Sequence, residues 1–203
     1  MDIAIIVFDG VDELDAVGPY RVFAGAAGAG ADLTVSLVTI EDAEWVVASN
    51  GLEIRTDGTL GEAEPDLVIV PGGGWNSRGE ASAWAEARKG VIPEAVADLH
   101  DDGVMVAGVC TGGMLLAETG LTDGRPAVTH AGALEELRET GAEVIDARVV
   151  DVGDLLTAGG VTSGLDLALY LLEREFGSSI ADSVATNLEY ERQGNVFRSQ
   201  NDA

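Results

Sequence analysis

Cys110 is the only cysteine in the 203-residue chain, and it lies in the stretch GVCTGG at residues 108–113. Gly108, Cys110 and Gly112 form the pattern G-x-C-x-G, the cysteine version of a nucleophile elbow, in which a sharp turn joins a strand to a helix. An apolar run precedes the turn, and residues 114–120 have a helical pattern. A helix N-terminus favours the thiolate form of a cysteine. Free cysteines are also common core residues, but the elbow context favours a nucleophile.

Two histidines are available as bases for this thiol. His130 follows the short apolar run PAVT, so we expect it at the end of another strand, where it would face the same crevice. The alternative is that it caps a helix starting near Ala131, and the pattern leaves both interpretations open. His100 lies near a helix end in DLHDDG, so we expect it on the solvated surface.

Three aspartates, Asp9, Asp12 and Asp15, lie in the loop expected after the first strand. Asp15 stands just before Gly18-Pro19, at the start of the first predicted helix. Its carboxyl is either a helix N-cap or a group placed against the sulfur of Cys110, and both roles can hold at once.

A second glycine cluster, PGGGW at residues 71–75, directly follows the apolar run DLVIV. Glycine-rich turns let backbone N–H groups point into a site with no Cβ in the way, which suits a developing negative charge. We therefore expect Gly72, Gly73 and Gly74 to support the site. Neither cluster has the spacing of a P-loop or of G-x-G-x-x-G, so a nucleotide site is not expected.

The elements that must position these residues alternate between strands and helices. The apolar runs are continuous, as in parallel strands covered on both faces. Helical patterns fill the gaps, and WVVASNGLEIRT is typical of a hairpin with a two-residue Asn50-Gly51 turn at an edge of the sheet. The predicted strands are residues 3–8, 33–40, 66–70 and 104–109, and the clearest predicted helices are 93–102 and 161–177.

This order predicts a doubly wound α/β fold with a mostly parallel sheet and helices on both faces. The length of the chain and the absence of a low-complexity linker favour one domain at residues 1–190. A polar tail follows at 191–203 and is either loose or an arm for a partner. Ligands of such folds bind beyond the carboxyl ends of the strands.

The charge balance is unusual, because 11 basic residues face 36 acidic ones, for a formal net charge of −25. A surface that binds nucleic acid needs a basic face, so that class of protein is not expected. Neither a membrane-spanning run nor a secretory signal is found in the sequence, and one cysteine cannot form an internal disulfide. We therefore expect a cytoplasmic protein that has no membrane partner.

Concentrated salt is expected to stabilise this protein, because it screens the repulsion among the scattered carboxylates. The simplest account of the composition is a salt-rich cytosol. We expect the melting temperature to rise between dilute and molar KCl, and an unchanged melting temperature would contradict this.

Four stretches together resemble the ThiJ/PfpI superfamily, relatives of the class I glutamine amidotransferase domain. They are LDAVGPYRVF at residues 14–23, VIVPGGG, GVCTGGMLLAETGLTDGRPAVTH and TAGGVTSGLDLAL. The D-x-x-G-P motif and the Cys-Thr-Gly elbow are most similar to the isonitrile hydratase branch. The resemblance implies a flavodoxin-like sandwich, usually a homodimer, with neither a metal nor an organic cofactor.

The resemblance also implies roles for individual residues. Cys110 would be the nucleophile, Asp15 the proton donor and acceptor near its sulfur, and the amides of Gly73 and Thr111 an anion hole. His130 matches the histidine of the family. The peptidase-like branch has a histidine where this chain has Thr111, so a protease is not expected. The amidotransferase His-x-Glu is missing, and the DNA-binding domain that some relatives carry is not expected in this chain.

These observations predict a cysteine-dependent lyase that hydrates a small electrophilic substrate, with conversion of an isonitrile to an N-substituted formamide as the leading hypothesis. A glyoxalase or deglycase acting on 2-oxoaldehydes would need the same thiol. A protein of a different class, a non-catalytic redox or stress-response protein, would use oxidation of Cys110 instead. A binding domain that has lost its activity is a fourth alternative.

Overall fold

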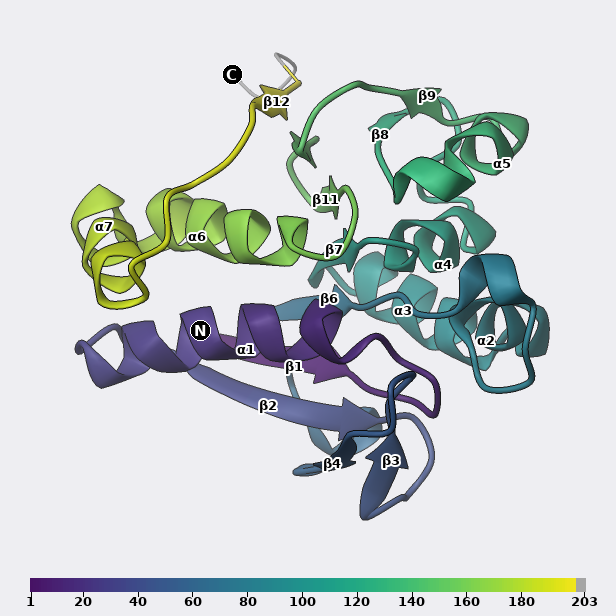
Figure 1. Cartoon of the computed structure of the whole chain (residues 1–203), viewed down its shortest axis with the longest axis horizontal. Coiled ribbons are helices and arrows are strands. Elements are labelled where there is room, and N and C mark those ends of the chain that lie inside the picture. Colours follow the sequence, from purple (N-terminus) through teal and green to yellow (C-terminus); the bar gives the residue numbers. More distant parts are fainter. Residues whose placement is uncertain (200–203) are drawn as a thin grey trace.

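The computed structural model describes residues 1–199 and has an eight-stranded sheet at its centre (Figure 1). The strand order is β12-β10-β11-β7-β6-β1-β2-β5, and every neighbouring pair is parallel except β10 with β11. The strands are β1 (Asp2–Ile6), β2 (Thr34–Thr39), β5 (Gly58–Thr59), β6 (Leu67–Val70), β7 (Met105–Val109), β10 (Val149–Asp151), β11 (Leu155–Ala158) and β12 (Val196–Arg198). This is the flavodoxin-like α/β architecture that the sequence predicts.

Helices cover both faces of the sheet. Helices α1, α6 and α7 contact one another and lie on the left of Figure 1, whereas α2, α3 and α4 form a second group on the right. The helices are α1 (Glu13–Gly28), α2 (Ala83–Lys89), α3 (Val91–Asp101), α4 (Gly112–Glu118), α5 (Leu134–Glu139), α6 (Ser163–Phe176) and α7 (Ser178–Asn187). Short 3-10 turns are η1 (Leu60–Glu62), η2 (Trp75–Ser77) and η3 (Ala131–Ala133).

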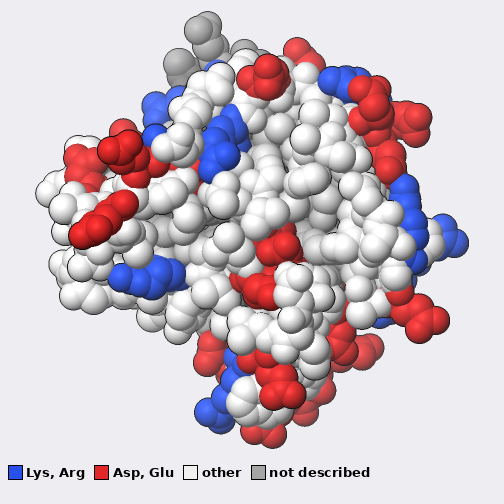
Figure 2. Space-filling view, viewed as in Figure 1, with Lys and Arg blue, Asp and Glu red and all other residues white. Residues whose placement is uncertain are grey.

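The core explains why the predicted strands are continuously apolar. All four residues of β6 are buried, as are the last four of β1 and of β7, because helices pack on both of their faces. Among the described residues no helix is long and apolar enough to cross a membrane. Figure 2 shows acidic side chains spread over the visible face with basic ones between them, as expected for a solvated charged surface.

The predicted hairpin is present, but its turn differs from the prediction. Strands β3 (Trp45–Val47) and β4 (Glu53–Arg55) pair with each other in a separate sheet. The Ala48 amide donates to the Leu52 carbonyl, so the loop has three residues, and Gly51 has a φ of 89° that only glycine adopts readily. Strand β3 is fastened to the loop after β1, since the Gly10 amide donates to the Val47 carbonyl.

The predicted tail is partly ordered against the body of the protein. Strand β12 extends the main sheet by pairing with β10, and Gln193 donates its backbone amide to Asp166. Residues 200–203 of that segment lie outside the described residues. Strands β8 (Pro126–Ala127) and β9 (Glu143–Val144) form a further small sheet, and β8 contacts β10 and β11, so the run before His130 is not part of the central sheet.

Candidate active site

Cys110 lies at a sharp turn between β7 and α4, where the predicted elbow was expected. Its φ is 56°, a left-handed conformation that costs energy for any residue with a Cβ. The Cys110 amide donates to the carbonyl oxygens of Ala158 and Gly159, at 3.1 and 3.0 Å, which holds the turn in place. A Cβ at Gly112 would lie 1.8 Å from the Val70 carbonyl oxygen, and one at Gly108 would lie 2.9 Å from the Gly113 nitrogen. Both glycines are therefore required by close backbone approach.

Asp15 lies inside α1 and is completely buried. Its Oδ2 accepts the Gly72 amide at 3.1 Å, and Oδ1 has no hydrogen-bond partner among residues 1–199. The Cys110 thiol lies close enough to change the pKa of this carboxyl. The helix N-cap is Asp12, whose carboxylate accepts the Leu14 amide, so the N-cap interpretation of Asp15 is wrong. The buried carboxyl belongs to the thiol site alone.

Burial controls the protonation of this pair. Burial first and the charge of Asp12 second raise the pKa of Asp15 to about 8, against a smaller opposite effect of the Cys110 thiol and the Gly72 amide. Burial first and the charge of Asp15 second raise the pKa of Cys110 to about 12. The expectation of a thiolate was therefore wrong, because desolvation outweighs the amides at the start of a short helix. Near neutral pH both groups hold their protons.

Backbone amides surround the sulfur, although not in the predicted combination. The backbone amides of Val161 and Thr111 lower the pKa of the thiol, by less than burial raises it. The Gly73 amide instead donates to the Thr111 hydroxyl at 3.1 Å, so it is already occupied. Val161 lies in the turn between β11 and α6, and the sequence signal for it was the glycine pair of TAGGV.

The PGGG turn packs tightly against the elbow and against the loop after β1. A Cβ at Gly72 would lie 2.3 Å from the Thr111 hydroxyl oxygen, and one at Gly73 would lie 2.3 Å from the Gly10 carbonyl oxygen. Gly73 and Gly74 have φ angles of 143° and 63°. The predicted supporting role of these glycines thus has a steric basis, since side chains would force the three segments apart.

His130 caps η3, because its Nδ1 accepts the Gly132 amide at 3.0 Å. The ring packs on Gly160, next to Val161, where an added Cβ would lie 2.8 Å from Cδ2. Within residues 1–199 the imidazole has no hydrogen bond to Cys110 or Asp15. The cap interpretation is confirmed. The ring lies next to the site but is not hydrogen-bonded to Cys110 or Asp15.

His100 was predicted to lie on the solvated surface, but its side chain is mostly covered. Its side chain is only 14% exposed and pairs with the Asp154 carboxylate at 2.9 Å. Asp154 comes just before β11, at the amino end of that strand, whereas Cys110 follows the carboxyl end of neighbouring β7. His100 therefore lies at the opposite end of the strands from the candidate site.

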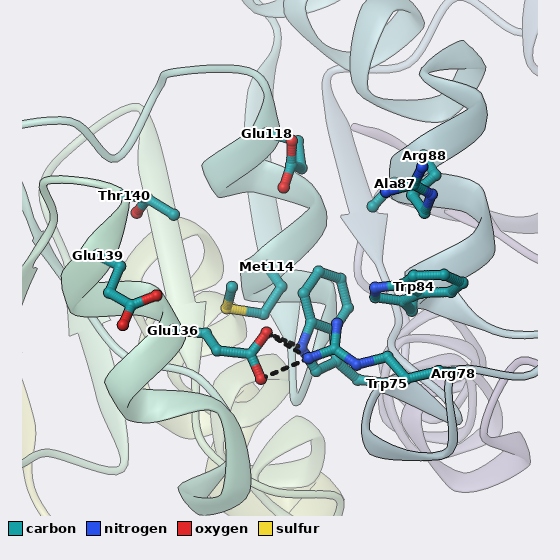
Figure 3. Close-up of a pocket in the computed structure, with 10 residues that line it drawn as sticks. All are labelled: Trp75, Arg78, Trp84, Ala87, Arg88, Met114, Glu118, Glu136, Glu139 and Thr140. Atoms are coloured by element: carbon teal, nitrogen blue, oxygen red, sulfur yellow. Dashed lines mark hydrogen bonds and ion pairs between the residues drawn. The ribbon is translucent and has the colours of Figure 1, made fainter.

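A pocket of about 500 Å³ lies beside the elbow and is lined by aromatic and charged side chains (Figure 3). Arg78 stacks on Trp75 and Trp84, and its guanidinium pairs with Glu136 at 2.7 Å. Trp75 follows the PGGG turn and Met114 belongs to α4, yet Cys110 does not line this pocket. Across residues 1–199 no cluster of three or more His, Cys, Asp or Glu side chains is placed to hold a metal ion.

The mostly parallel sheet, the cysteine elbow and the buried carboxyl beside it define an α/β protein built around a single thiol. The sequence model of the DJ-1/PfpI family matches residues 1–174, and this chain belongs to that family.

Two curated relatives show the range of the family. The chain is 32% identical over 191 residues to an isonitrile hydratase from Pseudomonas putida, covering 94% of this chain and 78% of the relative. It is also 32% identical over 178 residues to the HTH-type transcriptional regulator CdhR from Pseudomonas aeruginosa, covering 85% of this chain and 49% of the regulator. The family thus includes both an enzyme and a regulator.

Solved structures confirm the fold. A ThiJ/PfpI family protein from Pseudomonas syringae superposes with a TM-score of 0.83 at 26% identity, covering 95% of this chain and 76% of that one. DJ-1 from Schizosaccharomyces pombe superposes with a TM-score of 0.77 at 20% identity, covering 94% and 100% of the two chains, and it supports the fold alone.

Proposed function

We propose that this protein is a cysteine-dependent isonitrile hydratase, which converts an isonitrile and water to an N-substituted formamide. The observation that carries the proposal is the fully buried Asp15 carboxyl beside the Cys110 thiol, both protonated near neutral pH. A relative that is 32% identical is an isonitrile hydratase, which supports the same reaction.

The first half of the reaction joins the sulfur to the substrate. The isonitrile carbon carries a lone pair and accepts the proton of the Asp15 carboxyl, which makes that carbon electrophilic. The sulfur of Cys110 forms a bond to the same carbon, and the thiol proton moves to the Asp15 carboxylate. The product is a thioimidate, in which the former isonitrile carbon holds one hydrogen, the sulfur and a double bond to nitrogen.

The second half releases the product. Water adds to the thioimidate carbon, and the nitrogen receives a proton, so that a tetrahedral intermediate forms. The carbon–sulfur bond then breaks, the oxygen becomes the formamide carbonyl, and the sulfur recovers its proton through Asp15. Backbone amides of Thr111 and Val161 stabilise negative charge on the departing sulfur.

The same geometry argues against a redox sensor. Sensor cysteines are exposed and have a depressed pKa, whereas Cys110 is 5% exposed and its pKa is raised by burial. The homodimer and the salt-rich cytoplasm stay predictions.

We expect the purified protein in molar KCl to convert a simple alkyl or aryl isonitrile to the matching formamide, measured by NMR. Methylglyoxal, tested in parallel, is expected to give little turnover, because a 2-oxoaldehyde requires attack by a thiolate that this site holds protonated. Turnover of methylglyoxal without turnover of any isonitrile would replace the proposal by a glyoxalase or deglycase. If mild peroxide oxidises Cys110 stably, and the protein turns over neither methylglyoxal nor an isonitrile, the result would support a redox protein.

A further inference from the structure

The turn at residues 159–162, between β11 and α6, is a second wall of the thiol site. The Gly159 carbonyl accepts the Cys110 amide at 3.0 Å, and the Val161 amide faces the sulfur. Gly160 lies against His130. The position of this turn therefore determines how well a backbone amide reaches the sulfur.

Arg148 holds this turn at both ends. Its carbonyl oxygen accepts the Gly159 amide at 3.0 Å, and its Nη2 donates to the Thr162 hydroxyl at 3.0 Å. Thr162 is the N-cap residue of α6. A single residue, which directly precedes β10, thus fixes the start and the end of the turn that carries Val161.

The side chain of Arg148 is itself held by Asp166, in the first turn of α6. Arg148 Nε donates to Asp166 Oδ2 at 2.5 Å, and the Asp166 side chain is only 5% exposed. The guanidinium is a planar fork, so it can bridge a carboxylate and a hydroxyl at once, which a lysine ammonium on a flexible stem does less well.

A C-terminal strap, residues 190–195, closes over this pair. Tyr190 donates its hydroxyl to Asp166 Oδ2, and the Gln193 amide donates to Oδ1, each at 2.8 Å. The Asn195 carbonyl accepts the Arg148 amide at 3.1 Å. The family model matches only residues 1–174, so the strap lies beyond the matched region and yet is bonded to the residues behind the site.

We propose that Arg148, held by Asp166 and the C-terminal strap, is a positioning residue that sets the turn at 159–162 against the sulfur of Cys110. It acts through the backbone and does not contact the reacting atoms. This inference rests on the proposed function only in taking Cys110 as the reacting group, and it can be tested on the thiol directly.

Cys110 is the only cysteine, so alkylation by iodoacetamide, followed by intact mass, reports on this thiol alone. We expect Thr162→Val, which removes one acceptor and keeps the ion pair, to slow alkylation by about tenfold at every pH from 7 to 10, since a hydrogen bond that favours the thiolate is weakened. Arg148→Lys should behave similarly, because the ammonium keeps the pairing with Asp166 and loses the bridge to Thr162.

Arg174→Lys is the matched control. Arg174 pairs with Asp151 and has a side chain 27% exposed, close to the 23% of Arg148, and Asp151 is at the other end of β10 from the site. We expect its alkylation rate to stay within about twofold of the wild-type rate. Rates for folded Thr162→Val that equal or exceed the wild-type rate would overturn the proposal. If these rates fall while the wild type hydrates no isonitrile, the positioning role stands and the proposed function fails.

Discussion

Asp15→Asn is expected to stabilise the protein at alkaline pH. The pKa of Asp15 is about 8 in the folded protein and near its ordinary value of 3.8 when unfolded. Between these values the folded state holds a proton that the unfolded state has released, so wild-type stability falls as pH rises. Asparagine keeps an oxygen for the Gly72 amide and carries no charge. We expect it to raise the free energy of unfolding by on the order of 3 kcal/mol at pH 8.5, with almost no difference at pH 4.

Urea unfolding at several pH values measures this difference. Asp32→Asn is the control for charge alone, since Asp32 is exposed, and we expect it to change the free energy of unfolding by only about 0.5 kcal/mol at any pH.

The Asp15→Asn variant should also lose isonitrile turnover by roughly 10²- to 10⁴-fold, because asparagine can neither give nor take the proton. A stability difference that does not vary with pH would mean that Asp15 is ionised in the folded protein.

Cys110→Ala is expected to abolish isonitrile turnover, by roughly 10³-fold or more, while the protein stays folded. Alanine keeps the left-handed backbone and removes one sulfur atom from a residue that is 5% exposed, so the loss of stability should stay within about 2 kcal/mol. Formamide production and thermal melting measured on the same samples separate the two effects. An alanine variant with several per cent of the wild-type turnover would remove Cys110 from the mechanism.

Asp15 and Cys110 show how far the sequence could predict this site. The G-x-C-x-G pattern between an apolar run and a helix predicts the elbow, because both glycines are required by backbone contacts that recur wherever this turn forms. The protonation of the thiol was not predictable in the same way. Proximity to a helix start is visible in the sequence, whereas the depth of burial of the pair depends on packing of α1 and the PGGG turn.

Backbone donors were the hardest part to predict. The Val161 amide has no side-chain signature, and the Gly73 amide is occupied by the hydroxyl of Thr111, 38 residues further along the chain. The choice of Asp12 rather than Asp15 as the N-cap depends on where α1 begins, which sequence patterns locate only to within a few residues. The polar C-terminal segment is ordered by hydrogen bonds to Asp166, which lies far away in the sequence.

The most direct test of the central claim is to look for a covalent bond between the substrate and Cys110. The wild-type protein is mixed with an isonitrile, quenched with acid within the first turnover, and analysed by peptide mass spectrometry. The account predicts a mass increase equal to one isonitrile on the peptide that contains Cys110, lost as formamide appears. Formamide production with no adduct on that peptide at any quench time would contradict it.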